Sequence, residues 1–341
     1  MLQDKHFSWE FANFVIEMDF TDTILRWYAE NGRDLPWRRT RDPYAVWLSE
    51  IILQQTRVAQ GRAYWERFLE RFPTVDDLAA APEDEVLRLW QGLGYYSRAR
   101  NLHAAAKQIV SMGGFPSTLE GIRSLTGVGD YTAAAIGSIA FGLPAAVVDG
   151  NVYRVLARYF GIATPVGSTA AKKEFTALAQ RLLPPEAPAT FNQGMMDFGA
   201  TCCTPVNPTC LTCPLQPSCQ AFRDGRVELL PVKQEARKPV ERHLTYVYVR
   251  FQGRTVLHRR GAGDIWQGLW EPWLTDDVPA GAKPVVKAFK HQLTHRTLLA
   301  DFYLWEPAER PDLPDGYVWI EEAELDAYAK PRLFELLLEK L

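Results

Sequence analysis

Apolar residues recur at helical spacing over the first two thirds of the chain. They fall at positions i, i+3, i+4 and i+7, as on the buried face of a helix, in the segments 43–55, 56–72, 84–93, 97–112 and 151–160. Short connections carry glycine or proline, at 72–73, 92–94, 113–114, 143–144 and 184–185. Because no strand-like alternation interrupts residues 20–222, the pattern predicts an all-α domain.

The pattern changes beyond residue 242. Alternating, β-branched or aromatic runs that are typical of strands occupy 243–251, 255–259, 297–304 and 317–320, and a helical pattern closes the chain at 330–341. The segment 226–242 is rich in charge and proline, as linkers are. We therefore predict a multidomain chain with an all-α domain over 19–225, a linker over 226–242 and an α+β domain over 243–341.

The order of strands and helix in 243–341 is similar to that of the Nudix fold. The acidic REx2EE-type helix with which Nudix hydrolases hold metal is absent from this segment. Pyrophosphatase activity is therefore not expected. We predict a Nudix-like domain that serves recognition instead.

The composition is that of a folded globular protein. The 341 residues are 47% hydrophobic and 23% charged, which excludes disordered and collagen-like chains and suffices for two domains. No run approaches 18 apolar residues and the polar N-terminus lacks a signal-peptide core, so we expect a cytoplasmic protein with no membrane contact. The formal net charge of −3 gives no general reason to expect a nucleic-acid partner.

All five cysteines lie close together, spaced Cys202-Cys203-x6-Cys210-x2-Cys213-x5-Cys219. Clustered thiolates at short spacing indicate a metal site rather than disulfides. A zinc site usually presents two CxxC pairs, whereas here a single CxxC is flanked by longer loops. A 4Fe-4S cluster, whose corners are farther apart, is therefore favoured over zinc. Four ligands are needed, so one of the five cysteines is spare.

A glycine-rich turn, LTGVGDYT at 125–132, lies between helical patterns at 119–124 and 131–141. Its backbone N–H groups can bind a phosphate together with the N-terminus of the following helix, because no side chains stand in the way. Such a contact positions a protein on DNA without reading its sequence and needs no excess of positive charge. By itself, a G-x-G turn is also an ordinary connector between helices.

Five further motifs accompany this turn: LPWR at 35–38, WLSEIILQQT at 47–56, GLGYY at 92–96, DGNV at 149–152 and FNQ at 191–193. Together with the turn and the cysteine loop, they resemble the iron–sulfur helix–hairpin–helix DNA glycosylases. Within that superfamily the chain is similar to the adenine-excising MutY family. The resemblance runs from about residue 20 to 225 and more loosely to the end, which leaves residues 1–18 as an N-terminal extension.

The resemblance implies a monofunctional glycosylase of base excision repair. It would act as a monomer on double-stranded DNA and hydrolyse the N-glycosidic bond of adenine opposite 8-oxoguanine or guanine, after flipping the adenine out. Lyase relatives carry a lysine where this chain has Tyr131 and no acid where it has Glu50. Tyrosine cannot form the Schiff base of a lyase. A bifunctional endonuclease III-like lyase and a non-catalytic DNA-damage-binding protein remain as alternatives.

Two carboxylates suit the chemistry that the resemblance implies. A general acid must protonate the leaving adenine, and a negative charge must stabilise the oxocarbenium-like sugar. By resemblance Glu50 is the acid and later activates water, Asp149 stabilises the sugar cation or bonds to it transiently, and Tyr131 and Asn151 support them. From the residues alone, Glu50 would be a solvated helix carboxylate and Asp149 an N-cap.

The resemblance also implies the other residues of the site. Those expected to read the extruded base are Arg33, Trp37, Leu53 and Gln193. Those expected to contact DNA are Gln55 and Tyr95 near the vacated position, Gly127, Val128 and Gly129 in the hairpin, and Leu293, Thr294 and His295 where the family has Phe-Ser-His. The expected ligands of the cluster are Cys203, Cys210, Cys213 and Cys219. This set leaves Cys202 as a buried apolar residue, and Trp266, Trp270 and Trp273 are expected in a core.

Overall fold

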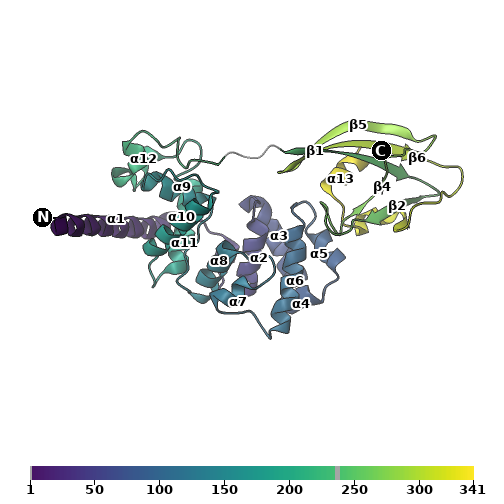
Figure 1. The fold of residues 1–341 in the computed structure, drawn as a ribbon. Coiled ribbons are helices and arrows are strands. Elements are labelled where there is room, and N and C mark those ends of the chain that lie inside the picture. Colours follow the sequence, from purple (N-terminus) through teal and green to yellow (C-terminus); the bar gives the residue numbers. More distant parts are fainter. Residues whose placement is uncertain (1, 235–238) are drawn as a thin grey trace. The chain divides into compact units, whose positions relative to one another are not determined.

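The computed structural model describes residues 2–234 and 239–341, with side chains from residue 17 onward (Figure 1). The described chain forms two compact units. A helical unit contains residues 2–54 and 108–234, and a mixed unit combines residues 55–107 with 239–341. No helix among the described residues has the length and apolar character that crossing a membrane requires.

The helical unit is built from helices and short 3-10 turns. They are α1 (Leu2–Asn31), η1 (Pro36–Arg38), α2 (Pro43–Leu53), α7 (Leu119–Arg123), α8 (Asp130–Phe141), α9 (Gly150–Tyr159), α10 (Thr169–Leu182), α11 (Pro188–Thr201), η2 (Cys210–Thr212), η3 (Gln216–Ser218) and α12 (Gln220–Arg223). Phe20, Phe175 and Phe198 are at most 1% exposed and belong to the core between α1, α9, α10 and α11. This core supports the ends of α2, α8 and α9, where the polar site lies.

Local sequence explains where these helices begin. Asp42 caps α2 by accepting the backbone N–H groups of Tyr44 and Ala45, and Pro43 occupies the first turn. Gly129, with extended backbone, precedes α8, and Gly142 ends it in the left-handed region at φ 67°. The start of α2 and both ends of α8 therefore lie at residues that the sequence marks clearly.

The mixed unit joins four helices to two sheets. The helices are α3 (Val58–Arg71), α4 (Val75–Ala80), α5 (Glu83–Leu89) and α6 (Ser97–Ser111), the last of which runs into the helical unit. One sheet has the order β4 (Trp273–Leu274), β1 (Val240–Val249), β6 (Arg296–Trp305), β5 (Lys283–Gln292), and the other β3 (Trp270–Glu271), β2 (Arg254–Arg259), β7 (Tyr317–Glu321). β1 and β6 are parallel and the other pairs antiparallel, and η4 (Glu322–Ala327) and α13 (Arg332–Leu338) complete the unit.

Specific contacts hold 55–107 to the C-terminal segment within this unit. Tyr96 Oη donates to the carbonyl of Lys330 at 3.3 Å, and Arg100 Nη1 donates to the carbonyl of Gln267 at 2.6 Å. Arg259 Nη2 lies 2.7 Å from an oxygen of Asp84. The sequence pattern did not indicate this association, because it depends on which surfaces meet.

The predicted fold class is confirmed: a helical region is followed by an α+β region of NUDIX type. The predicted strands appear as β1, β2, β6 and β7, but the long β5 and the two-residue strands β3 and β4 were missed. In β5 the register shifts twice and lysines face solvent, so the period of two that reveals a strand is lost.

The predicted boundaries of the domains stay predictions. α1 continues through the predicted extension 1–18, of which Met1 lies outside the described residues. In the predicted linker 226–242, residues 235–238 lie outside the described residues and β1 begins at Val240.

Candidate functional site

Glu50 is a buried acid on a helix that is buried on all sides. Every residue of α2 from Tyr44 to Ile52 is buried, and Glu50 itself is 8% exposed. The hydroxyl of Tyr131, on the first turn of α8, donates to Glu50 Oε2 at 3.0 Å. α2 and α8 thus bring together two predicted site residues that are 81 positions apart.

Burial raises the pKa of Glu50 from its ordinary value of 4.5 to about 7. The hydrogen bond from Tyr131 opposes this effect, the negative charge of Asp149 adds to it, and the more distant charge of Arg38 opposes it. At neutral pH this carboxyl group can therefore both carry and release a proton. Such a pKa is what a general acid needs.

Asp149 caps α9 and is held by three N–H groups. Its Oδ1 accepts the backbone N–H groups of Asn151 and Val152, each at 2.8 Å, and its Oδ2 accepts Asn151 Nδ2 at 2.8 Å. Burial raises the pKa of Asp149, while these hydrogen bonds oppose the rise. The N-cap role expected from the residues alone is thus present, and it leaves the carboxylate oriented at the positive end of a helix.

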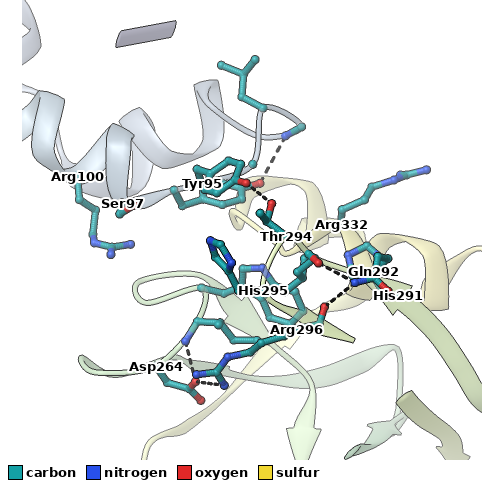
Figure 2. Close-up of a pocket in the computed structure, with 17 residues that line it drawn as sticks. Tyr95, Ser97, Arg100, Asp264, His291, Gln292, Thr294, His295, Arg296 and Arg332 are labelled. Atoms are coloured by element: carbon teal, nitrogen blue, oxygen red, sulfur yellow. Dashed lines mark hydrogen bonds and ion pairs between the residues drawn. The ribbon is translucent and has the colours of Figure 1, made fainter. Parts of the chain in front are cut away.

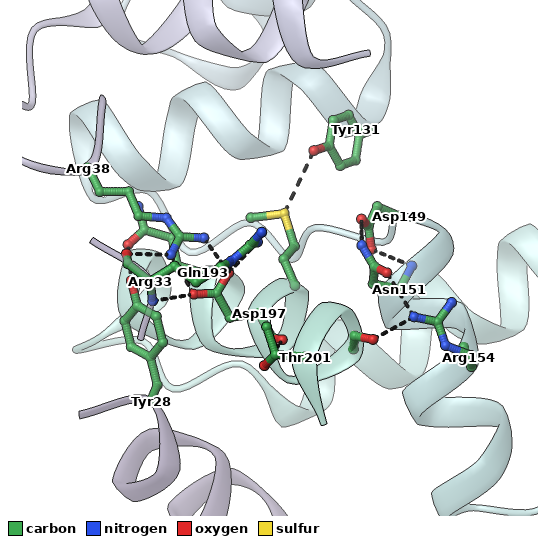
Figure 3. A network of polar contacts seen from close by, with 12 residues as sticks. Tyr28, Arg33, Arg38, Tyr131, Asp149, Asn151, Arg154, Gln193, Asp197 and Thr201 are labelled. Carbon is green, nitrogen blue, oxygen red and sulfur yellow. Dashed lines mark hydrogen bonds and ion pairs between the residues drawn. The ribbon is translucent and has the colours of Figure 1, made fainter. Parts of the chain in front are cut away.

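A chain of hydrogen bonds leads from Asp149 toward the cysteine loop (Figure 3). Arg154 Nη2 donates to Asn151 Oδ1 at 2.8 Å and to the carbonyl of Gly199 at 2.6 Å, and its Nε donates to the carbonyl of Cys203 at 2.7 Å. The buried guanidinium therefore fixes Asn151, which in turn fixes Asp149.

A second buried carboxylate, Asp197 on α11, binds two arginines (Figure 3). Its oxygens accept Nη1 of Arg38 at 2.5 Å, Nη2 of Arg33 at 2.5 Å and the backbone N–H of Arg33 at 2.8 Å. Burial would raise the pKa of Asp197, but the hydrogen bonds from Arg38 and Arg33 outweigh it and hold the pKa below its ordinary value. The sequence reasoning missed Asp197, whose partners lie 159 and 164 positions away.

The four residues expected to read the extruded base differ in their surroundings. Arg33 takes part in the ion pair with Asp197, and Gln193 Oε1 accepts the hydroxyl of Tyr28 at 2.8 Å. Trp37 is buried in η1, and Leu53 is half-buried at the end of α2. Their role toward a base stays a prediction.

The hairpin between α7 and α8 has the predicted backbone form. Gly127 has φ 77°, in the left-handed region that favours glycine, and Val128 is buried. A Cβ on Gly129 would meet no atom within 4 Å, so its backbone is open to an approaching ligand. The turn thus offers amides at the N-terminus of α8.

The two residues predicted to contact DNA near the vacated position, Gln55 and Tyr95, have strained backbones. Gln55 has φ 55° and is exposed, and Tyr95 has φ 45° and is 42% exposed. Residues other than glycine adopt this conformation at a cost of about 1–3 kcal/mol, and such strain clusters at functional sites.

Within the mixed unit, Tyr95 and the predicted 8-oxoguanine loop line one pocket of about 510 Å³ (Figure 2). The hydroxyls of Tyr95 and Thr294 are hydrogen-bonded to each other. Thr294 and His295 are exposed in the turn between β5 and β6, whereas Leu293 is half-buried against the core of this unit. Three arginines, Arg100, Arg296 and Arg332, lie around the same pocket.

The tryptophans of 266–273 differ in their surroundings. Trp270 packs against Tyr328 with ring centroids 5.1 Å apart, and Trp273 packs against Trp305 at 6.0 Å. Trp266 also contacts the core, but it has φ 60° and lines the pocket beside His291. The expected core role therefore describes only part of what Trp266 does.

All five cysteines line one small cavity of about 30 Å³. Arg158 Nη1 donates to Cys203 Sγ at 3.4 Å, and Cys219 Sγ lies 3.6 Å from the carbonyl oxygen of Arg158. In the described part of the chain, no three Cys, His, Asp or Glu side chains converge closely enough to hold a single metal ion. Thiol groups spread around a cavity and supplied with N–H donors fit a cubic cluster, which takes one thiolate at each corner.

Comparisons with known proteins found relatives of both regions of the chain. A family described as HhH-GPD superfamily base excision DNA repair protein matches residues 48–185, and a NUDIX domain matches residues 245–340. Adenine DNA glycosylase from Homo sapiens is 47% identical over 213 residues, which cover 59% of this chain and 39% of the human protein. The chain thus spans less than half the length of the mammalian relatives that it matches.

Bacterial relatives match over more of their length. Adenine DNA glycosylase from Buchnera aphidicola subsp. Baizongia pistaciae is 34% identical over 295 residues, which cover 82% of this chain and 84% of that protein. The solved structure of a thermostable thymine-DNA glycosylase is 32% identical with a TM-score of 0.58 and covers 62% of this chain and 99% of its own. A non-covalent endonuclease III–DNA complex, 24% identical with a TM-score of 0.53 over 60% of this chain and 94% of its own, shares the fold. This chain belongs to the adenine DNA glycosylase (MutY) family.

Proposed function

We propose that this chain is a monofunctional DNA glycosylase that hydrolyses the N-glycosidic bond of adenine opposite 8-oxoguanine or guanine in double-stranded DNA. The observation that carries the proposal is a pair of carboxyl groups. Glu50 is buried, which raises its pKa to about 7, and the half-buried Asp149 is bound by three N–H groups. Glu50 can donate a proton to the leaving base while Asp149 stabilises the sugar cation.

Glu50 supplies the proton. Because the hydroxyl of Tyr131 donates to Oε2, the proton of the neutral carboxyl resides on Oε1, from which it passes to adenine N7. The C–N bond then breaks with its electron pair leaving on adenine. The Glu50 carboxylate that results accepts a proton from the water that attacks the sugar carbon, and Glu50 is neutral again.

Asp149 stabilises positive charge on the sugar. Its two oxygens are oriented by Asn151 and Val152, and Arg154 fixes Asn151 in turn. Either electrostatic stabilisation or a transient bond to the sugar carbon suits this arrangement. Preorganised donors make the carboxylate ready without rearrangement during the reaction.

Tyr131 favours hydrolysis over lyase chemistry. Its hydroxyl is committed to Glu50, and a phenol cannot form the imine that a lyase needs. Neither lyase activity nor a purely DNA-binding role accounts for a buried acid with a pKa near neutral beside a second carboxylate.

DNA contacts complete the proposal. The amides around Gly127 and Gly129 bind phosphate, and Gln55 and Tyr95 occupy the duplex where the adenine has left. Arg33, Trp37, Leu53 and Gln193 read the extruded base, and Leu293, Thr294 and His295 read the opposite 8-oxoguanine. The protein acts as a monomer in the cytoplasm.

Four thiolates, from Cys203, Cys210, Cys213 and Cys219, would hold a 4Fe-4S cluster in the cavity that they line. When bound, the cluster supplies a covalent cross-link of the loop 203–219 rather than a reactive centre. Through Cys203 the loop supports Arg154, and through Arg154 it supports Asp149.

A single-turnover assay tests the proposal. Wild type should release adenine from a duplex carrying adenine opposite 8-oxoguanine, without strand cleavage and without a borohydride-trapped adduct at the level of a lysine lyase. Release by Glu50→Gln at the wild-type rate, or no release by either protein, would overturn it.

The recognition loop has its own test. The double substitution Leu293→Ala with Thr294→Ala should reduce excision opposite 8-oxoguanine much more than excision opposite guanine. Equal losses on both substrates would remove the assigned role of the loop and leave the catalytic proposal standing.

A further inference from the structure

Cys202 is the one cysteine for which the predicted cluster has no place. Its side chain is 7% exposed, at the end of α11, and it packs in the same core as Leu215. An apolar residue would satisfy such a position. The thiol, however, also lines the cavity that the four predicted ligands line.

The sulfur of Cys202 has polar partners that include a predicted ligand. It accepts the hydroxyl of Thr209 at 3.5 Å, and the thiol of Cys213, which lines the same cavity, is its other polar neighbour. The predicted ligands Cys203 and Cys219 have different neighbours, since both contact Arg158. Cys202 therefore belongs to the corner of the cavity that Cys213 occupies.

The backbone holds Cys202 in this place independently of its thiol. Its N–H donates to the carbonyl of Phe198 at 3.0 Å, and its carbonyl accepts the N–H of Thr209 at 3.2 Å. The neighbouring Cys203 donates its N–H to the same Phe198 carbonyl at 2.8 Å. Two adjacent sulfurs are thus presented to one cavity by a single helix end.

We propose that Cys202 is a reserve ligand, a fifth thiolate that binds the iron of the Cys213 corner when the Cys213 sulfur is lost or displaced. Thiolate is the ligand that iron–sulfur clusters prefer, and the Cys202 thiol lines the same small cavity as the sulfur that it would replace. The proposal rests on the cluster being bound and not on adenine excision.

The exchange balances without a redox partner. The Fe–S bond to Cys213 breaks and the Cys213 thiolate takes up a proton, while the Cys202 thiol releases a proton and its sulfur forms a new Fe–S bond. The number of thiolates on the cluster, its charge and its electron count stay unchanged. Neither an oxidant nor a reductant is needed.

Retention of the cluster is measured in the purified protein of 341 residues. The readouts are iron and acid-labile sulfide per chain and the visible charge-transfer absorbance. Cys202→Val should bind the cluster as wild type does, because the reserve ligand is not in use. Cys213→Ala should retain most of its iron, whereas Cys202→Val with Cys213→Ala should lose it. Both of the last two variants carry the same change at Cys213, so a general folding defect affects them equally.

Cys219→Ala is the matched control. The Cys219 sulfur lies against the carbonyl of Arg158 at 3.6 Å, so Cys202 is not positioned to replace it. Cys219→Ala and Cys202→Val with Cys219→Ala should therefore lose iron alike. Alkylation of the folded proteins adds a second readout, since Cys202 should become protected in Cys213→Ala.

Two results would overturn the reserve role. One is equal loss of iron from Cys213→Ala with and without Cys202, which would leave Cys202 as a filler of the core. The other is loss of iron from Cys202→Val alone, which would make Cys202 an obligatory ligand. Wild type without iron would instead refute the cluster itself, an outcome that is distinct from both.

Discussion

Two buried carboxyl groups of the helical unit, Glu50 and Asp197, have opposite electrostatic surroundings. Glu50 is 8% exposed and Asp197 is fully buried, so loss of water penalises the ionised form of both. Asp197 binds two guanidinium groups and a backbone N–H, and its pKa is lowered in spite of burial. Glu50 has one direct donor, the hydroxyl of Tyr131, and burial raises its pKa to about 7.

The difference suits a structural role for Asp197 and the reactive role that we propose for Glu50. Asp197 is compensated by charge and stays ionised, so it serves to fix Arg33 and Arg38. Glu50 is left without a direct cationic partner among the described residues and retains its proton near neutral pH. A buried charge without a full set of partners lowers stability, and such residues are concentrated at functional sites.

The largest expected effect concerns the rate of excision. Replacing Glu50 by Gln removes the transferable proton but keeps the size of the side chain, so the single-turnover rate should fall by about a hundred- to ten-thousand-fold. Asp197→Glu, a control that keeps the charge on the other buried site, should retain measurable excision. An unchanged rate for Glu50→Gln would show that Glu50, like Asp197, is not the acid of the reaction.

The next effect concerns stability at Asp197. Asp197→Asn leaves Arg33 and Arg38 without their buried counter-charge and should lower the free energy of unfolding by about 3–5 kcal/mol. Because the pKa of Asp197 is lowered, its contribution is present at neutral pH and is lost as the pH falls through its folded value. Denaturant unfolding at neutral pH measures this loss. A variant as stable as wild type would show that the ion pair is not structural.

Glu50→Gln should have the opposite effect on stability. Because the folded pKa is raised from 4.5 to about 7, the stability associated with the neutral carboxyl is complete below about pH 4.5 and is lost as the pH rises through 7. At 1.36 kcal/mol per unit of pKa, ionisation of Glu50 in the folded protein costs about 3 kcal/mol of stability. The inactive variant should therefore be the more stable protein above pH 7, and the gain should vanish near pH 4.5. Equal stability at alkaline pH would show that Glu50 carries no penalty for ionisation.

The smallest effect concerns Tyr131. Tyr131→Phe removes the hydrogen bond that lowers the pKa of Glu50, so this pKa should rise above 7 and the alkaline limb of the rate profile should shift to higher pH. A shift toward lower pH would mean that the hydroxyl acts on another group.

The sequence reasoning selected Glu50, Asp149 and Tyr131 as site residues but missed Asp197. Glu50, Asp149 and Tyr131 stand in motifs whose resemblance to a family is local, and the structure brings Glu50 and Tyr131 into direct contact. Asp197 is one acid in an otherwise apolar stretch of α11, and its partners lie more than 150 positions away in the chain. Only the packing of η1 and the end of α1 against α11 reveals that it is paired.

The fold, like the site, was predictable where the sequence signal is local and not where it depends on contacts between distant segments. The helical spacing of apolar residues predicted α2, α3, α6 and α9, although α2 is buried on all sides and not on one face alone. The association of 55–107 with the C-terminal sheets depends on pairs such as Tyr96 with Lys330, which no local pattern encodes. The net charge of −3 was equally uninformative, because the backbone amides that we propose to bind phosphate carry no formal charge.

The pH dependence of single-turnover adenine excision tests most directly the claim that neutral Glu50 is the acid. For wild type on a duplex with adenine opposite 8-oxoguanine, the rate should fall as the pH rises through about 7, because the proton is lost from Glu50. It should fall again at low pH, as Asp149 becomes protonated. A rate that stays level or increases from about pH 6 to 9 would contradict the account.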